Sequence, residues 1–321
     1  MSTRDDQHLP IIEIILLCIK PELTADEVKQ LRQVITAGID WKQFHFRIRQ
    51  GQVQVLAYTN LMEHCKDLLS EHRIKNIQVF LRRRLHLSMK YFNALYKLVT
   101  AASEQGVTVV SYKGPTLAYQ AYGAFHLRTF VDIDVIVHEG DLLTVDRILT
   151  EQGYRPTQPV DLTSAAHRQA KHYVYKHPED DVSVEVHWRL KKAWAACKSM
   201  DVEGVITRSI ELDIQGITYR VPSLEDNLVV LASHGNQHLW SRIIWISDVA
   251  NLLKQYDVDW DLLLQRAEAT ASRRVILLAL YICQELFKIR LPQSIQQMID
   301  AERFLQTAGN FVLTQIRNYK I

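Results

Sequence analysis

The spacing of hydrophobic positions changes twice along the chain, near residues 105 and 222. Before residue 105 it is mostly helical, with apolar side chains three and four residues apart. The clearest such stripe is Leu85, Met89, Phe92, Leu95 and Val99. This stripe predicts a long amphipathic helix with one core face, which we expect to end at Gly106.

The N-terminal region carries two further helix signals. Thr24, with Glu27 three residues later, predicts a capping box at the start of a helix near Ala25. The apolar run 9–19 contains Glu13 and has about half the ~20 residues of a membrane span, so we interpret it as a buried helix. The first ten residues lack the basic-then-apolar order of a signal peptide, which favours a cytoplasmic protein.

Residues 106–222 have the short, β-branched and alternating pattern of strands. Predicted strands cover 107–112, 131–137, 172–176 and 182–188, and a hairpin turns at Gly216 within 211–221. Predicted helices cover 116–122 and 141–152, and they are closed by Gly123 and Gly153.

Helical spacing returns after residue 222. Ser223 is the expected cap of the first helix, with Asp226 at the capping-box position. Further helices are predicted at 245–256, 260–269 and 272–287. The fold class is therefore α/β (α+β): a small mixed sheet in 106–222, flanked by helical regions 1–105 and 223–321. We expect the three parts to pack closely, because the boundaries are changes of periodicity and not flexible linkers.

Composition narrows the possible partners. The net charge of +2 argues against a nucleic-acid coat or a polybasic membrane anchor. The four cysteines are far apart in sequence and form no CxxC pair, so neither a zinc site nor a disulfide framework is indicated.

Two aspartates lie inside an apolar strand. Strand side chains alternate, so Asp132 and Asp134 share one face while Ile133, Val135 and Val137 point into the core. Two neighbouring carboxylates repel each other, and burying them unpaired costs several kcal/mol. A divalent cation resolves this conflict, and hard oxygen ligands suit Mg²⁺.

A third acid has a similar setting. Glu185 lies on the alternating strand 182–188 and shares a face with Ser183 and His187. If this strand lies beside the aspartate strand, three carboxylates converge, as two-metal phosphoryl transfer requires. The alternative is an acidic strand face exposed to water, which two aspartates alone would not exclude.

A glycine turn precedes the aspartates. Lys113 and Gly114 follow the predicted strand 107–112, and a glycine, exposed amides and a lysine suit a triphosphate. The order of strand, glycine turn, helix, strand with two aspartates and later strand with one acid resembles the DNA polymerase beta-like nucleotidyltransferase superfamily.

The chain more closely resembles an uncharacterised bacterial family of nucleotidyltransferases, over most of its length. The matching pieces are Asp40-Trp41, Lys113-Gly114, Tyr122-Gly123, Arg128, Asp132-Ile133-Asp134, Gly153-Tyr154, Glu185-Val186-His187-Trp188, the segment 234–242, Trp245 to Asp248 and Asp259-Trp260. The chain departs from the superfamily pattern at Pro115, where many members have serine, and in the longer spacing between Gly114 and Asp132.

The resemblance implies a role for each matching residue. Asp132, Asp134 and Glu185 would bind two Mg²⁺ or Mn²⁺ ions, and Glu185 would also accept the acceptor's proton. Lys113, the Gly114 amide and Arg128 would contact phosphates. His187 is expected near the nucleotide.

His234 and His238 are four residues apart on a predicted helix, so their rings share one face, which Arg242 extends. The resemblance places this helix across the cleft, touching nucleotide or acceptor, and Asp248 is a candidate to orient one imidazole. Leu239 is expected to supply core on this helix, so the two imidazoles are expected to act as hydrogen-bond donors whose charge responds near neutral pH. The alternative is a histidine pair buried at a domain interface.

Together these residues predict transfer of a nucleoside monophosphate from a nucleoside triphosphate to a hydroxyl, with release of pyrophosphate. The acceptor is expected to be a small molecule, peptide or protein in preference to nucleic acid. One alternative is an antitoxin-like or regulatory protein that binds nucleotide without turnover. Another is a helical scaffold with an incidental acidic sheet face. The sequence does not indicate an oligomeric state.

Overall fold

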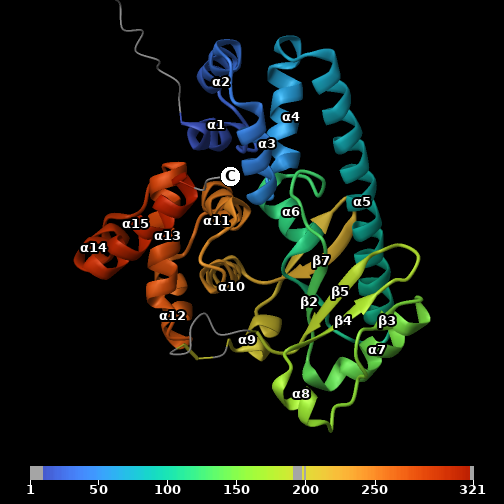
Figure 1. Cartoon of the computed structure of the whole chain (residues 1–321). Helices are drawn as coiled ribbons and strands as arrows, with labels where there is room; N and C mark the ends of the chain where they lie inside the picture. Colours follow the sequence, from blue (N-terminus) through green and yellow to red (C-terminus); the bar gives the residue numbers. More distant parts are fainter. Residues whose placement is uncertain (1–9, 191–196, 199, 319–321) are drawn as a thin grey trace, which may run out of the picture.

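The computed structural model describes residues 10–190, 197–198 and 200–318. Figure 1 shows a central sheet with helical regions beside it and above it, and a long helix along one side. The expectation about a signal peptide concerns mainly residues 1–9, which lie outside the described residues.

Helices account for most of the chain. They are α1 (Ile11–Cys18), α2 (Ala25–Ala37), α3 (Trp41–Gln50), α4 (Gln54–His64), η1 (Lys66–Leu68), α5 (Glu71–Glu104), α6 (Gly114–Tyr122), η2 (Glu139–Asp141), α7 (Leu142–Glu151), α8 (Ala165–Gln169), α9 (Val202–Thr207), α10 (Leu224–Gln237), α11 (Ile243–Gln255), α12 (Trp260–Ala269), α13 (Arg273–Phe287), α14 (Gln293–Ala301) and α15 (Arg303–Asn318). The strands are β1 (Val110–Ser111), β2 (Ile133–Ile136), β3 (Arg155–Pro156), β4 (His172–Lys176), β5 (Ser183–His187), β6 (Ile210–Ile214) and β7 (Ile217–Val221).

The seven strands form one mixed sheet in the order β3-β4-β5-β2-β1-β7-β6. Two pairs are parallel, β2 with β5 and β1 with β7, and the remaining pairs are antiparallel. The predicted class, a mixed sheet flanked by helices, is confirmed.

The two faces of the sheet have different partners. Ile133, Val135 and Val137 point to one face, as predicted, and join a core that includes side chains of α5 and α7. On the opposite face, Ile136 packs with side chains of α9 and with Val230 of α10. Asp134 alternates with Ile133 and Val135, so it also lies on this second face.

The N-terminal and C-terminal helical regions share one hydrophobic core. Ile15 of α1, Leu61 of α4, Ile246 of α11 and Ile282 of α13 belong to the same cluster of buried side chains. The regions are therefore far apart in sequence but packed together. The division at residues 105 and 222 stays a prediction.

The predicted caps Thr24 and Ser223 are confirmed. The Thr24 hydroxyl accepts from the Glu27 amide and the Glu27 carboxylate accepts from the Thr24 amide, which completes the capping box. Ser223 accepts from the Asp226 amide at the start of α10. α5 ends at Glu104, just before Gly106, which adopts a φ of +72°. Among the described residues, no helix is both long and apolar enough to span a bilayer.

The predicted core face of α5 is partly wrong. Leu85 and Met89 are 41% and 56% exposed. The buried row of the C-terminal half runs through Tyr91, Leu95, Leu98 and Ala102. These residues face the sheet, and Leu85 and Met89 project off that row. Helical spacing alone identified the helix but not which rotation of it meets the sheet.

Candidate active site

The two aspartates lie where α5 fixes the start of β2. Asp132 directly precedes the strand and is half-buried, whereas Asp134 lies within it and is only 3% exposed. The Arg84 guanidinium donates to the Phe130 carbonyl at 2.9 Å. The Tyr91 hydroxyl donates to the Val131 carbonyl at 2.5 Å. These bonds hold the backbone that presents the aspartates.

Glu185 is brought beside Asp134 by the parallel pairing of β2 with β5. The two residues are direct register partners, so their side chains project from the same face. His187 lies on that face too, with Nε2 3.2 Å from Asp134 Oδ1 and 3.3 Å from Glu185 Oε2. The structure therefore gathers Asp132, Asp134 and Glu185 in one place.

The glycine turn packs directly against the aspartate strand. Gly114 has a φ of +60°, and a Cβ there would lie 3.0 Å from the Asp132 carbonyl oxygen. A larger residue would therefore strain the turn and push it from β2. Lys113 precedes the turn, and its Nζ lies 3.5 Å from Asp134 Oδ1. Gly114 also begins α6, whose first turn has no side-chain cap and contains Pro115.

The carboxylates carry more negative charge than the surrounding cations neutralise. Burial, together with Asp134 and Glu185, raises the pKa of Asp132 to about 6. Burial also acts to raise the pKa of Asp134, but Lys113 and His187 outweigh it and lower that pKa below its usual range. The uncompensated negative charge of the group therefore appears as the raised pKa of Asp132.

His187 and Glu185 favour each other's charged forms. Burial opposes protonation of His187, but its hydrogen bonds to Asp134 and Glu185 raise the imidazole pKa above its usual value. The hydrogen bond from His187 lowers the pKa of Glu185, against the opposing effect of burial. Glu185 is therefore ionised near neutral pH.

These carboxylates fit a divalent cation. Asp132, Asp134 and Glu185 offer hard oxygen ligands from adjacent backbone positions, and the raised pKa of Asp132 shows that a further positive charge would be favourable there. They are the residues that would hold such an ion.

Two cavities meet at the carboxylates. The larger, of about 330 Å³, is lined by residues that include Lys113, Gly114, Asp132, Asp134, Arg242 and Trp245. The smaller, of about 90 Å³, is lined by His187, Leu190, Met200 and Val230. Lys113, His172, Glu185, His234 and His238 border both. Of the three carboxylates, Glu185 alone borders both cavities, so a ligand in either cavity would contact it.

Arg128 was expected to contact phosphate, but in the structure it pairs with a carboxylate of the protein. Its Nε and Nη2 both donate to the Asp248 carboxylate at 2.8 Å, and Asp248 also accepts from the Tyr122 hydroxyl at 2.8 Å. Arg128 and Asp248 are buried. This ion pair joins the segment before β2 to α11, and Tyr122 joins it to α6. Arg128 borders the larger cavity, but two of its nitrogens already serve this connection.

The histidine pair borders the two cavities, but the segment 234–242 is not one continuous helix as predicted. α10 ends at Gln237, and Leu239 and Trp240 have φ values of 52° and 53°. Arg242 therefore does not extend the histidine face; it lies at the start of α11. The rings of His234 and His238 are 4.9 Å apart, and both lie within 5.2 Å of the Trp245 ring.

Two assumptions about this segment are wrong. Leu239 was expected to supply core and is instead 68% exposed, because the turn after α10 points it outward. His234 was expected to change charge near neutral pH. Burial, with help from Lys113 and His238, lowers its pKa to about 2, so His234 stays neutral. His238 is exposed, which argues against a purely buried interface role for the pair.

His172 is a site residue that the sequence reasoning missed. It begins β4 and is the direct cross-strand partner of His187. Its Nε2 lies 3.8 Å from Glu185 Oε2. Pairing the predicted strands 172–176 and 182–188 across their short turn would have placed the two histidines opposite each other.

Comparison with known proteins places this site in a family. A family model described as "Uncharacterised nucleotidyltransferase" matches residues 37–288. This is well over half of the chain and includes the three carboxylates, the glycine turn and the histidine pair. The chain belongs to this family, and the resemblance found in its sequence is confirmed.

The other comparisons give little more. No curated protein matches significantly. Among solved structures, the chain resembles the crystal structure of ANT(2″)-Ia in complex with adenylyl-2″-tobramycin, at 15% identity and a TM-score of 0.37, over 56% of this chain and 97% of that one. A solution structure of ANT(2″)-Ia matches at 15% identity and a TM-score of 0.36, over 70% and 97%. These likenesses are too low to bear on the substrate.

Proposed function

We propose that the protein transfers a nucleoside monophosphate from a nucleoside triphosphate to a hydroxyl acceptor. The observation that carries this proposal is the convergence of Asp132, Asp134 and Glu185 beside the Gly114 turn. The acceptor oxygen bonds to the α-phosphorus, the bond from that phosphorus to the β-phosphate oxygen breaks, and pyrophosphate leaves. The acceptor's proton passes to Glu185.

Each element of the larger cavity has a task in this reaction. Lys113 and the uncapped N-terminus of α6 offer a cation and backbone amides to the triphosphate. Mg²⁺ held by the carboxylates would neutralise phosphate charge and lower the pKa of the acceptor hydroxyl. Trp245 and the neutral His234 border the same cavity and offer surfaces for the base or sugar. Arg128 holds the aspartate segment in position through Asp248.

The acceptor is proposed to enter from the smaller cavity, which places its hydroxyl next to Glu185. Leu190, Met200 and Val230 give this cavity an apolar side, which favours a small molecule or a peptide side chain over a nucleic acid. The buried free thiols Cys18, Cys65, Cys197 and Cys283 suit the proposed cytoplasmic location.

The test is incubation of the purified protein with each α-labelled nucleoside triphosphate, Mg²⁺ and cell extract, followed by identification of the labelled product. We expect label on a distinct acceptor, and none with Asp134→Asn. Nucleotide binding without transfer to any fraction would favour the regulatory alternative. Absence of both binding and transfer would favour a scaffold.

A further inference from the structure

Two histidine side chains lie beside the three carboxylates of the candidate active site, and binding of a metal ion by the carboxylates alone gives these histidines no role. His172 Nε2 lies 3.8 Å from Glu185 Oε2, and His187 Nε2 lies 3.3 Å from the same oxygen. The three potential ligand atoms all lie within 4.8 Å of one another. Ligand atoms bound to one ion at about 2.1 Å lie about 3.0–3.5 Å apart, so small side-chain movements suffice to surround an ion.

We propose that His172, Glu185 and His187 form a nitrogen-containing metal site, which takes a transition-metal ion such as Mn²⁺, Co²⁺ or Zn²⁺ in preference to Mg²⁺. Imidazole nitrogen suits these ions, whereas Mg²⁺ takes mostly oxygen ligands and keeps several waters. The ion would lie on the side of the carboxylates where the acceptor is proposed to bind. Its role in the transfer reaction rests on the proposed function, but its binding does not.

The sheet places the two histidines together by register. His172 and His187 are direct partners in the antiparallel pair β4–β5, and their ring centroids are 4.7 Å apart. Glu185 is two residues before His187, so it projects from the same face. Asp134 adds a carboxylate oxygen 3.2 Å from His187 Nε2. The ligand geometry is thus set by backbone pairing and not by flexible loops.

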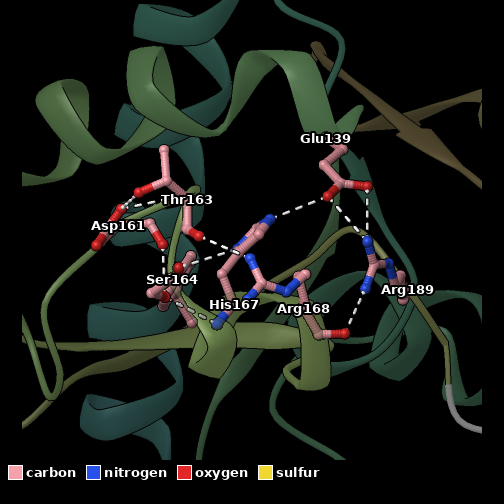
Figure 2. A network of polar contacts seen from close by, with 8 residues as sticks. Glu139, Asp161, Thr163, Ser164, His167, Arg168 and Arg189 are labelled. Atoms are coloured by element: carbon pink, nitrogen blue, oxygen red, sulfur yellow. Dashed lines mark hydrogen bonds and ion pairs between the residues drawn. The ribbon is translucent and has the colours of Figure 1, made fainter.

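A polar network outside the site fixes the chain on both sides of the histidine pair (Figure 2). His167 Nε2 lies 2.9 Å from Glu139 Oε1, and Arg189 donates to both oxygens of Glu139. Arg189 also donates to the Arg168 carbonyl at 3.0 Å. The network ties the segment just before His172 to the residues just after His187.

Backbone bonds and ring packing complete this support. The amides of Trp188 and Arg189 both donate to the Lys171 carbonyl at 3.2 Å. The His167 ring stacks on Trp188 at 4.7 Å and its Nδ1 lies 3.0 Å from the Tyr173 hydroxyl. Residues 171–173 and 187–189 are therefore held in register, as a preorganised ligand set requires.

The three proposed ligands line the two cavities. His172 and Glu185 border both cavities, and His187 lines the smaller one. An ion bound there would therefore be reachable from the smaller cavity, where the acceptor is proposed to bind. The competing interpretation is that His187 only hydrogen-bonds Asp134 and Glu185, and that Mg²⁺ is bound by the carboxylates alone.

The test is titration of the full-length protein, freed of metal and without nucleotide, with Co²⁺, followed by its visible absorption. We expect one saturable site with d–d bands of mixed nitrogen and oxygen coordination, and competition by Mn²⁺ and Zn²⁺ at far lower concentration than by Mg²⁺. Even outer partners of metal ligands contribute roughly 10–100-fold to affinity. His172→Ala should therefore weaken Co²⁺ binding by at least about tenfold.

His177→Ala is the matched control, because His177 follows the opposite end of the same β4–β5 hairpin. It should leave the Co²⁺ affinity and spectrum unchanged. Equal Co²⁺ affinity in His172→Ala and wild type, or Mg²⁺ competition as strong as Mn²⁺ competition, would overturn the inference. Nucleotide is absent from this titration, so a failure of the proposed transfer reaction would leave the metal result intact, and the reverse also holds.

Discussion

Asp134 and Glu185 are register partners across the parallel strands β2 and β5, and His187 Nε2 lies within 3.3 Å of both carboxylates. The two carboxylates differ in their surroundings. Asp134 is only 3% exposed and adjoins Lys113, for which we propose a role in phosphate binding. Glu185 is half-buried and faces the smaller cavity as well.

Glu185→Gln should therefore reduce the chemical step more than nucleotide binding. Loss of a positioned proton acceptor typically costs roughly 10²–10⁴-fold in rate, whereas Lys113 and Asp134 remain to bind the triphosphate. Single-turnover rates and nucleotide affinity measured on the same variant give the two numbers. Ser183→Ala, on the same face of β5, is the control. Equal losses in affinity and rate would place Glu185 on the nucleotide side.

Asp132→Asn should stabilise the metal-free protein in a pH-dependent way. Burial and the neighbouring carboxylates raise the folded-state pKa of Asp132 from 3.8 to about 6. The wild type therefore loses stability as pH rises from 3.8 through 6, and the loss is complete above 6. Two pKa units correspond to about 3 kcal/mol.

Thermal or urea unfolding at pH 7.5 and pH 3.5 measures this effect. We expect Asp132→Asn to be more stable than wild type at pH 7.5 and equal to it at pH 3.5. Saturating Mg²⁺ should stabilise the wild type and have much less effect on the variant. A variant that is less stable than wild type at pH 7.5 without metal would contradict the electrostatic account.

Arg128→Met should lower the free energy of unfolding of the protein, and should not act on nucleotide affinity alone. It leaves the fully buried Asp248 carboxylate without its guanidinium, and breaking a buried ion pair from one side costs roughly 3–5 kcal/mol. Adding Asp248→Asn should recover part of this loss, because it removes the uncompensated charge. Normal stability with weakened nucleotide binding would instead return Arg128 to a phosphate-binding role.

His238→Ala should lower activity well beyond any change in stability. His238 is exposed, borders both cavities and packs 5.1 Å from the Trp245 ring. Turnover per folded molecule and melting temperature, measured together, separate the two effects. Leu239→Ala, the exposed neighbour in the same turn, is the control. A lower melting temperature with normal turnover would end the cleft role.

Local signals in the sequence predicted most of the fold that carries the site. Capping residues and glycines placed α2, α6, α7 and α10 to within a few residues, and alternation placed β2, β4 and β5. These signals act over a few residues, so they are visible in the sequence. The short elements β3, α8 and α9 were not predicted, because a segment of so few residues is too short to display a periodic pattern of hydrophobic positions.

Contacts between distant segments were not predictable in the same way. Arg128 and Asp248 are 120 positions apart, and nothing local marks them as partners. The exposure of Leu85, Met89 and Leu239 likewise depends on how helices rotate and turn against their neighbours. Alternation placed Asp134 on one face with Asp132, and Glu185 on one face with His187, but only the strand order β5-β2 makes Asp134 and Glu185 adjacent.

The most direct test of the central claim is calorimetric binding of a non-hydrolysable nucleoside triphosphate analogue. We expect binding to wild type with Mg²⁺, none with a chelator, and roughly 10-fold or greater weakening in Lys113→Met. Asp134→Asn keeps the side-chain volume but gives up the ion pairs with Lys113 and His187, so its melting temperature is measured alongside. The folded variant should lose the Mg²⁺-dependent binding. Binding to Asp134→Asn as tight as to wild type, with the same Mg²⁺ dependence, would contradict the claim that these carboxylates hold the nucleotide through a divalent cation.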